Sequence, residues 1–118
     1  MRFLGILWSP EIIELTTQNF GTTIRSHRHL LVNFYSPKCK YCKQFEPEYE
    51  KVAYALRKRE PPVPVAKINA TVEGTIAAEQ GIDRYPTVKL FKTTIAIRYD
   101  GPKDATHLLQ WLEKRIPN

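Results

Sequence analysis

The sequence predicts an α/β fold in which helices cover both faces of a mixed central β-sheet. β-like and helical patterns alternate along most of the 118 residues, which is typical of parallel strand–helix–strand units. Two β-like runs near the C-terminus, 87–91 and 95–99, then follow each other directly, and the short polar turn between them predicts an antiparallel hairpin. With a last helix after the hairpin, the expected order is βαβαβαββα in one domain with a single core.

The N-terminal elements are expected to be a strand, a helix and a second strand. Residues 12–15 form a short apolar run, and Thr16 or Thr17 then offers an N-cap for a helix. The run 30–35 is almost continuously apolar, as expected of a central strand covered on both faces. Asn33 is its one polar interruption.

A long helix should follow the central strand, from about Cys39 to Arg59. Apolar residues recur there at helical spacing, with charged and amide side chains between them. Pro47 lies inside this helix, where it removes one backbone hydrogen bond and is expected to kink the axis. The apolar face consists of Phe45, Tyr49, Val52, Ala53 and Leu56.

The C-terminal half contains two more helices. Residues 63–69 predict a strand and 73–80 a short helix, which Gly81 closes at a position that needs φ > 0. The last helix begins near Asp104 and ends before Pro117. It is expected to bury Ala105, Leu108, Leu109, Leu112 and Ile116.

The formal net charge of +6 does not point to a nucleic-acid partner. The densest basic runs, 25–29 and 57–59, lie where helices should end, and the helix dipole favours cations there. No aromatic residues are interleaved with basic ones as in single-strand binders, so we expect no nucleic-acid binding.

Residues 1–11 are interpreted as an N-terminal arm or the remnant of a signal, and 12–118 as the domain. The start is basic and then apolar, but its apolar run is shorter than the about 7 to 15 residues of a signal peptide. No stretch approaches the about 20 apolar residues of a membrane span.

The chemistry of the sequence is concentrated in Cys39 and Cys42, its only two cysteines. Two cysteines separated by two residues at a helix start have sulfurs close enough to form a disulfide. The unpaired N–H groups of the first helical turn face the first sulfur and favour its negative form. We therefore expect Cys39 to be largely thiolate, the species that attacks disulfides.

Two other roles for the cysteines are weaker. A zinc site would need two more ligands from His27, His29 or His107, without a recognisable spacing. A purely structural disulfide would close a very short loop and would therefore stabilise the fold little. Redox chemistry is the favoured interpretation, with no metal and no organic cofactor.

The segment 31–43, LVNFYSPKCKYCK, resembles the active-site strand and helix start of the thioredoxin superfamily. It is most similar to the catalytic, a-type domains of protein disulfide isomerases. Further matches follow in the same order along about residues 12–115, and they are EPEY at 46–49, AKINAT at 66–71, RYPTVKLF at 84–91 and YDGPK at 99–103.

The resemblance implies a thioredoxin fold and a role for each matching residue. Cys39 would be the nucleophile that forms a mixed disulfide with a substrate, and Cys42 the buried thiol that resolves it. Pro86 would be a cis-proline facing the two sulfurs. The backbone of Tyr85 would pair with an extended substrate segment, beside side-chain contacts from Lys38 and Tyr41.

The sequence departs from the family pattern around the cysteines. Lys38 replaces the usual Trp before the first cysteine, and Lys40-Tyr41 replaces the usual Gly-His between the two. The loss of His removes one group that stabilises the thiolate, whereas the added lysines supply positive charge.

Three further positions concern proton transfer; Asn33 and Lys103 depart from the family pattern, whereas Lys67 matches it. Asn33 stands where the family has a buried acid beneath the second cysteine, and an amide cannot accept its proton. Lys67 either is buried without a charged partner and substitutes as the base, or simply reaches solvent, which we favour. Lys103 replaces an arginine that favours thiolate in the second cysteine. It keeps the positive charge but lacks the planar guanidinium group.

The predicted function is a thiol–disulfide oxidoreductase that forms, reduces or isomerises disulfides in protein substrates. The alternative is a thioredoxin-like module that binds clients and turns over poorly because of Asn33 and the Lys40-Tyr41 pair. By resemblance we expect a monomeric domain, alone or as part of a multidomain chain, in the endoplasmic reticulum lumen, with glutathione or an upstream oxidase as redox partner. The glycosylation sequon at Asn69 is interpreted as a chance match.

Overall fold

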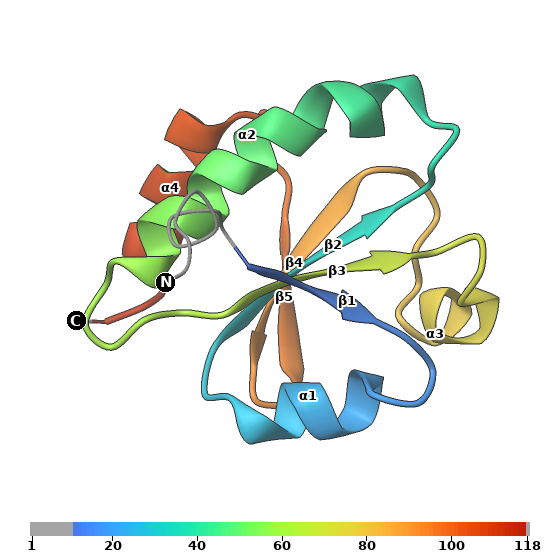
Figure 1. The fold of residues 1–118 in the computed structure, drawn as a ribbon, viewed down its shortest axis with the longest axis horizontal. Helices are drawn as coiled ribbons and strands as arrows, with labels where there is room; N and C mark the ends of the chain where they lie inside the picture. The colour runs from blue at the N-terminus through green and yellow to red at the C-terminus, as the bar shows by residue number, and fades with distance from the viewer. Residues whose placement is uncertain (1–10, 118) are drawn as a thin grey trace, which may run out of the picture.

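The structure, a computed structural model, describes residues 11–117 and shows the predicted order of elements (Figure 1). The arm expected at residues 1–11 lies outside the described residues except for Glu11. Within residues 11–117 no helix is long and apolar enough to cross a membrane. The elements are β1 (Ile12–Leu15), α1 (Phe20–Ser26), β2 (Leu30–Tyr35), α2 (Lys40–Arg57), β3 (Val65–Asn69), α3 (Gly74–Glu79), β4 (Thr87–Lys92), β5 (Ile95–Tyr99) and α4 (Ala105–Glu113).

The five strands form one mixed sheet in the order β1-β3-β2-β4-β5. β3 pairs in parallel with both β1 and β2, whereas β4 is antiparallel to β2 and β5 is antiparallel to β4. The predicted hairpin is therefore confirmed, and β2 lies at the centre of the sheet. Figure 1 shows α2 and α4 on one side of the sheet and α1 on the other.

The alternation of side chains along β2 divides the core into two layers. Leu31 packs with apolar residues of α2 and α4, whereas Val32 and Phe34 pack with residues of α1 and α3. Because successive strand residues point to opposite faces, Asn33 shares the α2 face with Leu31. This parity places the polar residue of the central strand beneath the helix that carries the cysteines.

The ends of α2 and α3 differ from the prediction by one or two residues, and the start of α1 and the end of α4 differ more. The N-cap of α1 is Asn19, not Thr16 or Thr17, because these residues form a turn in which the Thr16 N–H donates to Asn19 Oδ1 at 2.7 Å. α4 ends at Glu113, before the predicted end, although Ile116 remains buried.

Other predicted details are confirmed or refined. Gly81 has a φ of +66° after α3, as its position required. Leu109, expected in the core, is only partly buried at its edge. α2 continues without a break through Pro47.

Two side chains of α2 fix its position over the sheet. The Tyr49 hydroxyl donates to the carbonyl of Ala66 at 2.7 Å and lies 3.3 Å from the carbonyl of Leu31, so it contacts both central parallel strands. Glu48 Oε1 accepts the backbone N–H of Ala105 at 2.8 Å, which joins α2 to the start of α4. These contacts hold the middle of α2 over β2 and β3 and against the start of α4.

The chain leaves β3 through a turn closed by the side chain of Asn69. Asn69 Oδ1 accepts the N–H and the hydroxyl of Thr71, at 3.1 and 2.7 Å, and lies 3.3 Å from the N–H of Val72. Inside this turn the Ala70 N–H donates to the carbonyl of Tyr35 at 2.8 Å, and Ala70 is buried. The sequon therefore begins at the C-terminal end of β3, an interior strand of the sheet.

Candidate dithiol site

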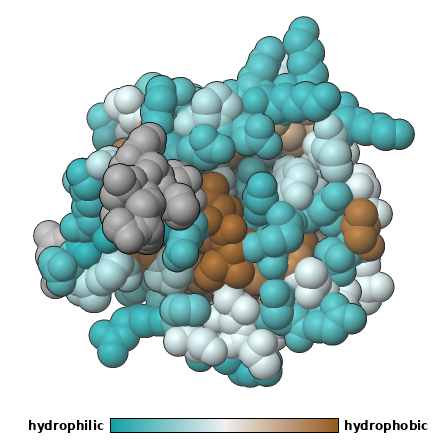
Figure 2. Space-filling model, in the orientation of Figure 1, coloured by the Kyte–Doolittle hydropathy of each residue, from teal (hydrophilic) through white to brown (hydrophobic). Residues whose placement is uncertain are grey.

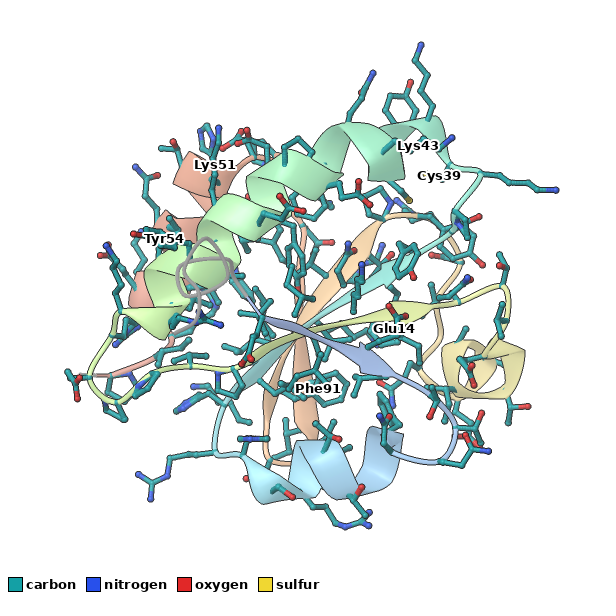
Figure 3. All side chains as sticks on the ribbon, in the orientation of Figure 1. Glu14, Cys39, Lys43, Lys51, Tyr54 and Phe91 are labelled. Carbon is teal, nitrogen blue, oxygen red and sulfur yellow. The ribbon has the colours of Figure 1, made fainter. Side chains whose placement is uncertain are left out.

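Cys39 lies at the junction of β2 and α2, where it is the N-cap of the helix. Its Sγ accepts the backbone N–H of Cys42 at 3.1 Å, which satisfies one of the free donors of the first turn. The sulfur is partly exposed, and Figure 3 shows it beside Lys43 at the end of α2. The donated N–H and the positive end of the helix dipole both stabilise a negative sulfur.

Cys42 is different, because only 6% of its surface is exposed. Burial raises the pKa of its thiol to about 12, and the neighbouring sulfur of Cys39 adds to the rise, while a backbone contact with Ser36 opposes it. Both cysteines are free thiols in the structure. The site thus combines an accessible, helix-capping sulfur with a second thiol that is held protonated.

The peptide bond between Tyr85 and Pro86 is cis, as the resemblance implies. The Cys39 thiol lies 3.8 Å from the carbonyl oxygen of Tyr85, within reach of a weak S–H donation. The loop before β4 is therefore in direct contact with the first sulfur. A second cis bond, between Glu60 and Pro61, was not predicted and lies outside this site.

A hollow of about 300 Å³ separates this loop from the first turns of α2; we call it the cis-proline hollow. It brings together Tyr41, Tyr85, Pro86 and Lys103, all of them predicted site residues. The remaining lining residues, Gln44, Phe45 and Arg84, were missed. Arg84 could have been found, because it directly precedes the Tyr85-Pro86 pair in the sequence.

A second hollow, of about 410 Å³, lies on the other side of α2, between the helix and the sheet; we call it the amide hollow. Asn33 and Cys42 both line it. Asn33 is 6% exposed, and its side-chain oxygen is buried without a hydrogen-bond partner. The other lining residues are Ile12, Tyr35, Ser36, Pro37, Lys43, Glu46, Tyr49, Glu50 and Lys67.

The structure does not support a buried Lys67 without a charged partner. Its Nζ lies 3.9 Å from Glu14 Oε1, and its side chain is 34% exposed. Strand register explains the pair, since Lys67 is opposite Glu14 on β1 and opposite Asn33 on β2. The Tyr35 hydroxyl also donates to Glu14, at 3.1 Å, and burial together with this carboxylate raises the pKa of Tyr35 to about 12.

The remaining predicted residues, Lys38 and Lys40, are exposed on either side of Cys39 and line neither hollow. The predicted substrate contacts therefore separate: Tyr41, Tyr85 and Pro86 share one hollow, and Lys38 does not join them. Among residues 11–117 no three His, Cys, Asp or Glu side chains are grouped so that they could hold a metal ion. His107 instead contacts Asp104, at the start of α4.

A mixed sheet with a reactive cysteine pair at the start of α2 and a cis-proline against it defines a dithiol domain of the thioredoxin class. The Thioredoxin family profile matches residues 11–114, and the chain belongs to this family.

Similar proteins agree with this assignment. Protein disulfide-isomerase A4 of Homo sapiens is 38% identical over 104 residues, which are 87% of this chain and 16% of that protein. Protein disulfide-isomerase of Drosophila melanogaster is 36% identical over 104 residues, 88% of this chain and 21% of its own. The chain thus spans about a fifth of these relatives. The solution structure of the first thioredoxin domain of mouse protein disulfide-isomerase A4 superposes with a TM-score of 0.80 at 31% identity, covering 97% of this chain and 84% of that domain.

Proposed function

We propose that this domain is a thiol–disulfide oxidoreductase that acts on cysteine-containing proteins, as the names of its isomerase relatives suggest. The observation that carries the proposal is the capping of α2 by Cys39 Sγ, next to a loop carbonyl and in front of a second thiol. The likeness to protein disulfide isomerases also supports placement in the secretory pathway, in the endoplasmic reticulum lumen.

The reaction proceeds by two exchange steps. The Cys39 thiolate attacks one sulfur of a substrate disulfide, forms a mixed disulfide and releases the other substrate sulfur as a thiolate. Cys42 then loses its proton and attacks the Cys39 sulfur. The Cys39–Cys42 disulfide forms, the substrate leaves as a dithiol, and two electrons have passed to it. Oxidation of substrates is the reverse sequence, and neither direction requires a metal or an organic cofactor.

The side chains around the two sulfurs favour a faster first exchange step and a slower second one. Cys39 is exposed enough to meet a substrate, and the first turn of α2 stabilises its charge. Cys42 must ionise from a buried position, and the group beneath it is an amide rather than a carboxylate. We infer that resolution of the mixed disulfide is the slow step.

Trapping the mixed disulfide tests the proposal. The Cys42→Ala variant should accumulate a covalent adduct with a disulfide-containing protein through Cys39, and Cys39→Ser should form none. Absence of an adduct in Cys42→Ala, while the variant is folded, would show that the domain does not carry out the exchange.

A client-binding module is the second candidate, favoured by the high pKa of Cys42 and the unpartnered oxygen of Asn33. The double variant Cys39→Ala/Cys42→Ala separates the two. A binding module retains its clients without either thiol, whereas an oxidoreductase of ordinary type loses most of its hold on them.

A further inference from the structure

The cis-proline hollow is the part of the surface that a substrate meets when its sulfur reaches Cys39. The loop on one side of the hollow carries Tyr85, whose carbonyl is 3.8 Å from the Cys39 sulfur. The volume of about 300 Å³ is at the low end of ligand sites in proteins, about 300 to 1,000 Å³, so it suits one stretch of an extended peptide.

The charged residues that line this hollow are both cations, Arg84 and Lys103, and no carboxylate is among its described lining residues. Of the nearby acids, Asp83 contacts Arg84 itself, 3.4 Å from its Nε, whereas Asp100 contacts Arg98, 3.2 Å from its Nε. The contact with Asp83 involves Nε rather than the tip of the guanidinium, and the Arg84 side chain is 70% exposed. The Arg84 guanidinium therefore remains accessible to a binding partner although it is paired with Asp83.

Lys103 is half-buried, and burial is the main cause that lowers its pKa. Among its charged neighbours Asp100 has the largest effect and raises the pKa, whereas Arg98 and Arg84 lower it. An anion in the hollow would relieve this repulsion.

The surroundings of Cys39 carry the same sign. Lys38, Lys40 and Lys43 are exposed around it, and Figure 2 shows hydrophilic side chains projecting at this end of α2. In contrast, the amide hollow on the other side of the helix contains two acids, Glu46 and Glu50, beside its lysines. Among the lining residues, the cis-proline hollow therefore has two cations and no acid, whereas two lysines and two acids balance each other in the amide hollow.

Aromatic rings stand beside the two cations. Tyr41 is 68% exposed and Tyr85 is 36% exposed, although large aromatic side chains are usually covered. Rings beside cations form a surface that binds the backbone and apolar atoms of a peptide while the cations bind its carboxylates.

We propose that the cis-proline hollow is a specificity subsite that selects client cysteines flanked by Asp or Glu. The inference rests on the proposed oxidoreductase function and names its substrate class: acidic peptide segments, held by Arg84 and Lys103 against Tyr41 and Tyr85. Selection acts on the first step, the attack of Cys39 on the client disulfide.

The test uses the Cys42→Ala variant, in which the first step can be followed alone. Three disulfide-linked peptide dimers differ only in the residues on each side of the cysteine, which are Glu, Ser or Lys. The rate of the Cys39–peptide adduct is measured by mass spectrometry, together with the rate for hydroxyethyl disulfide, which is neutral and too small to fill the hollow.

The Glu peptide should react about fivefold to tenfold faster than the Lys peptide at low salt, the effect of two exposed ion pairs. The ratio of the rate for the Glu peptide to the rate for the Lys peptide should approach one in about 1 M sodium chloride, where the screening length is about 3 Å. Arg84→Gln should reduce the ratio at low salt by at least about twofold. The matched variant Arg25→Gln removes a cation from the end of α1, on the other face of the sheet, and should keep the ratio.

Equal rates for the three peptides, or an equal loss of the ratio in Arg84→Gln and Arg25→Gln, would overturn the subsite while leaving the exchange chemistry intact. A variant that reacts with neither the peptides nor hydroxyethyl disulfide would instead contradict the proposed function.

Discussion

Replacing Asn33 by Asp changes the proton chemistry of the site with almost no change in shape. The two side chains are isosteric, and the Asn33 oxygen already lies unpartnered in the hollow that Cys42 lines. The substitution therefore adds a proton acceptor beneath the second cysteine and alters little else. We expect it to accelerate the second exchange step.

The size of the effect follows from the pKa of Cys42. In the reduced dithiol a value of about 12 means that at pH 7 only about one thiol in 10⁵ is ionised, five units below the pKa. Burial is the largest cause of this rise and persists in the mixed disulfide, so Cys42 stays largely protonated there as well. A positioned general base contributes about 10²- to 10⁴-fold to a proton transfer. Resolution in Asn33→Asp should be faster than in the wild type by at least about 100-fold at pH 7.

A single-turnover experiment measures this step. The reduced protein is mixed with a peptide disulfide, the reaction is quenched with acid, and the loss of the mixed disulfide is followed. In the wild type the rate of resolution should rise about tenfold per pH unit between about pH 6 and pH 9, because the thiolate fraction does. In Asn33→Asp the dependence should flatten above the pKa of the new carboxyl.

Asn33→Leu is the matched control, because it removes the amide without adding an acceptor. It should keep the steep pH dependence of the wild type. If Asn33→Asp resolves at the wild-type rate and with the same slope, proton removal from Cys42 is not what limits the step, and the reasoning fails.

Three other changes test packing and ionisation. Tyr49→Phe removes the donor to the Ala66 carbonyl and should lower the free energy of unfolding in urea by about 1 to 2 kcal/mol; no loss would mean that this bond contributes nothing in solution. Leu108→Ala should lower the free energy of unfolding by about 2 to 5 kcal/mol, because Leu108 is fully buried. Ile95 is exposed, so Ile95→Ala should change the free energy of unfolding by no more than about 0.5 kcal/mol. Similar losses in the two variants would contradict the assigned core. The folded-state pKa of Cys42 is raised, so the stability that its neutral thiol contributes is present below about pH 8.5 and is lost as the pH rises toward 12. Between about pH 8 and pH 10 the reduced wild type should therefore lose about 1 to 2 kcal/mol more than Cys42→Ala, and parallel losses would contradict the shift.

The fold was predictable because local patterns and long-range pairing agree in this chain. The continuous apolar run of β2 predicts a buried central strand, and the helical spacing of α2 predicts a helix with one apolar face. Both predictions agree with the structure, in which α2 packs on the sheet around β2. The boundaries were less predictable, because the turn before α1 depends on the side chain of Asn19 rather than on the threonines. Similarly, burial of Ile116 continues beyond the end of α4, so the apolar pattern overestimates the length of the helix.

The cysteine pair was predictable from spacing, but the surroundings of its second member were not. Asn33 was identified from its place in an apolar strand, and the structure places it in the amide hollow with Cys42. The partner of Lys67 could not be found from local sequence, because Glu14 is 53 residues away along the chain, and only the parallel register of β1 and β3 brings them together. Finding this partner requires both the strand order and the register of β1 against β3.

The turn closed by Asn69 also bears on any modification of its sequon. A glycosyltransferase must reach the Asn69 amide and the Thr71 hydroxyl, and in the folded domain these two side chains bond to each other. Between them Ala70 is buried, and its N–H donates to the Tyr35 carbonyl at the end of the central strand. Sugar transfer to the folded domain would therefore have to break the Asn69–Thr71 contact, next to a backbone hydrogen bond of the sheet.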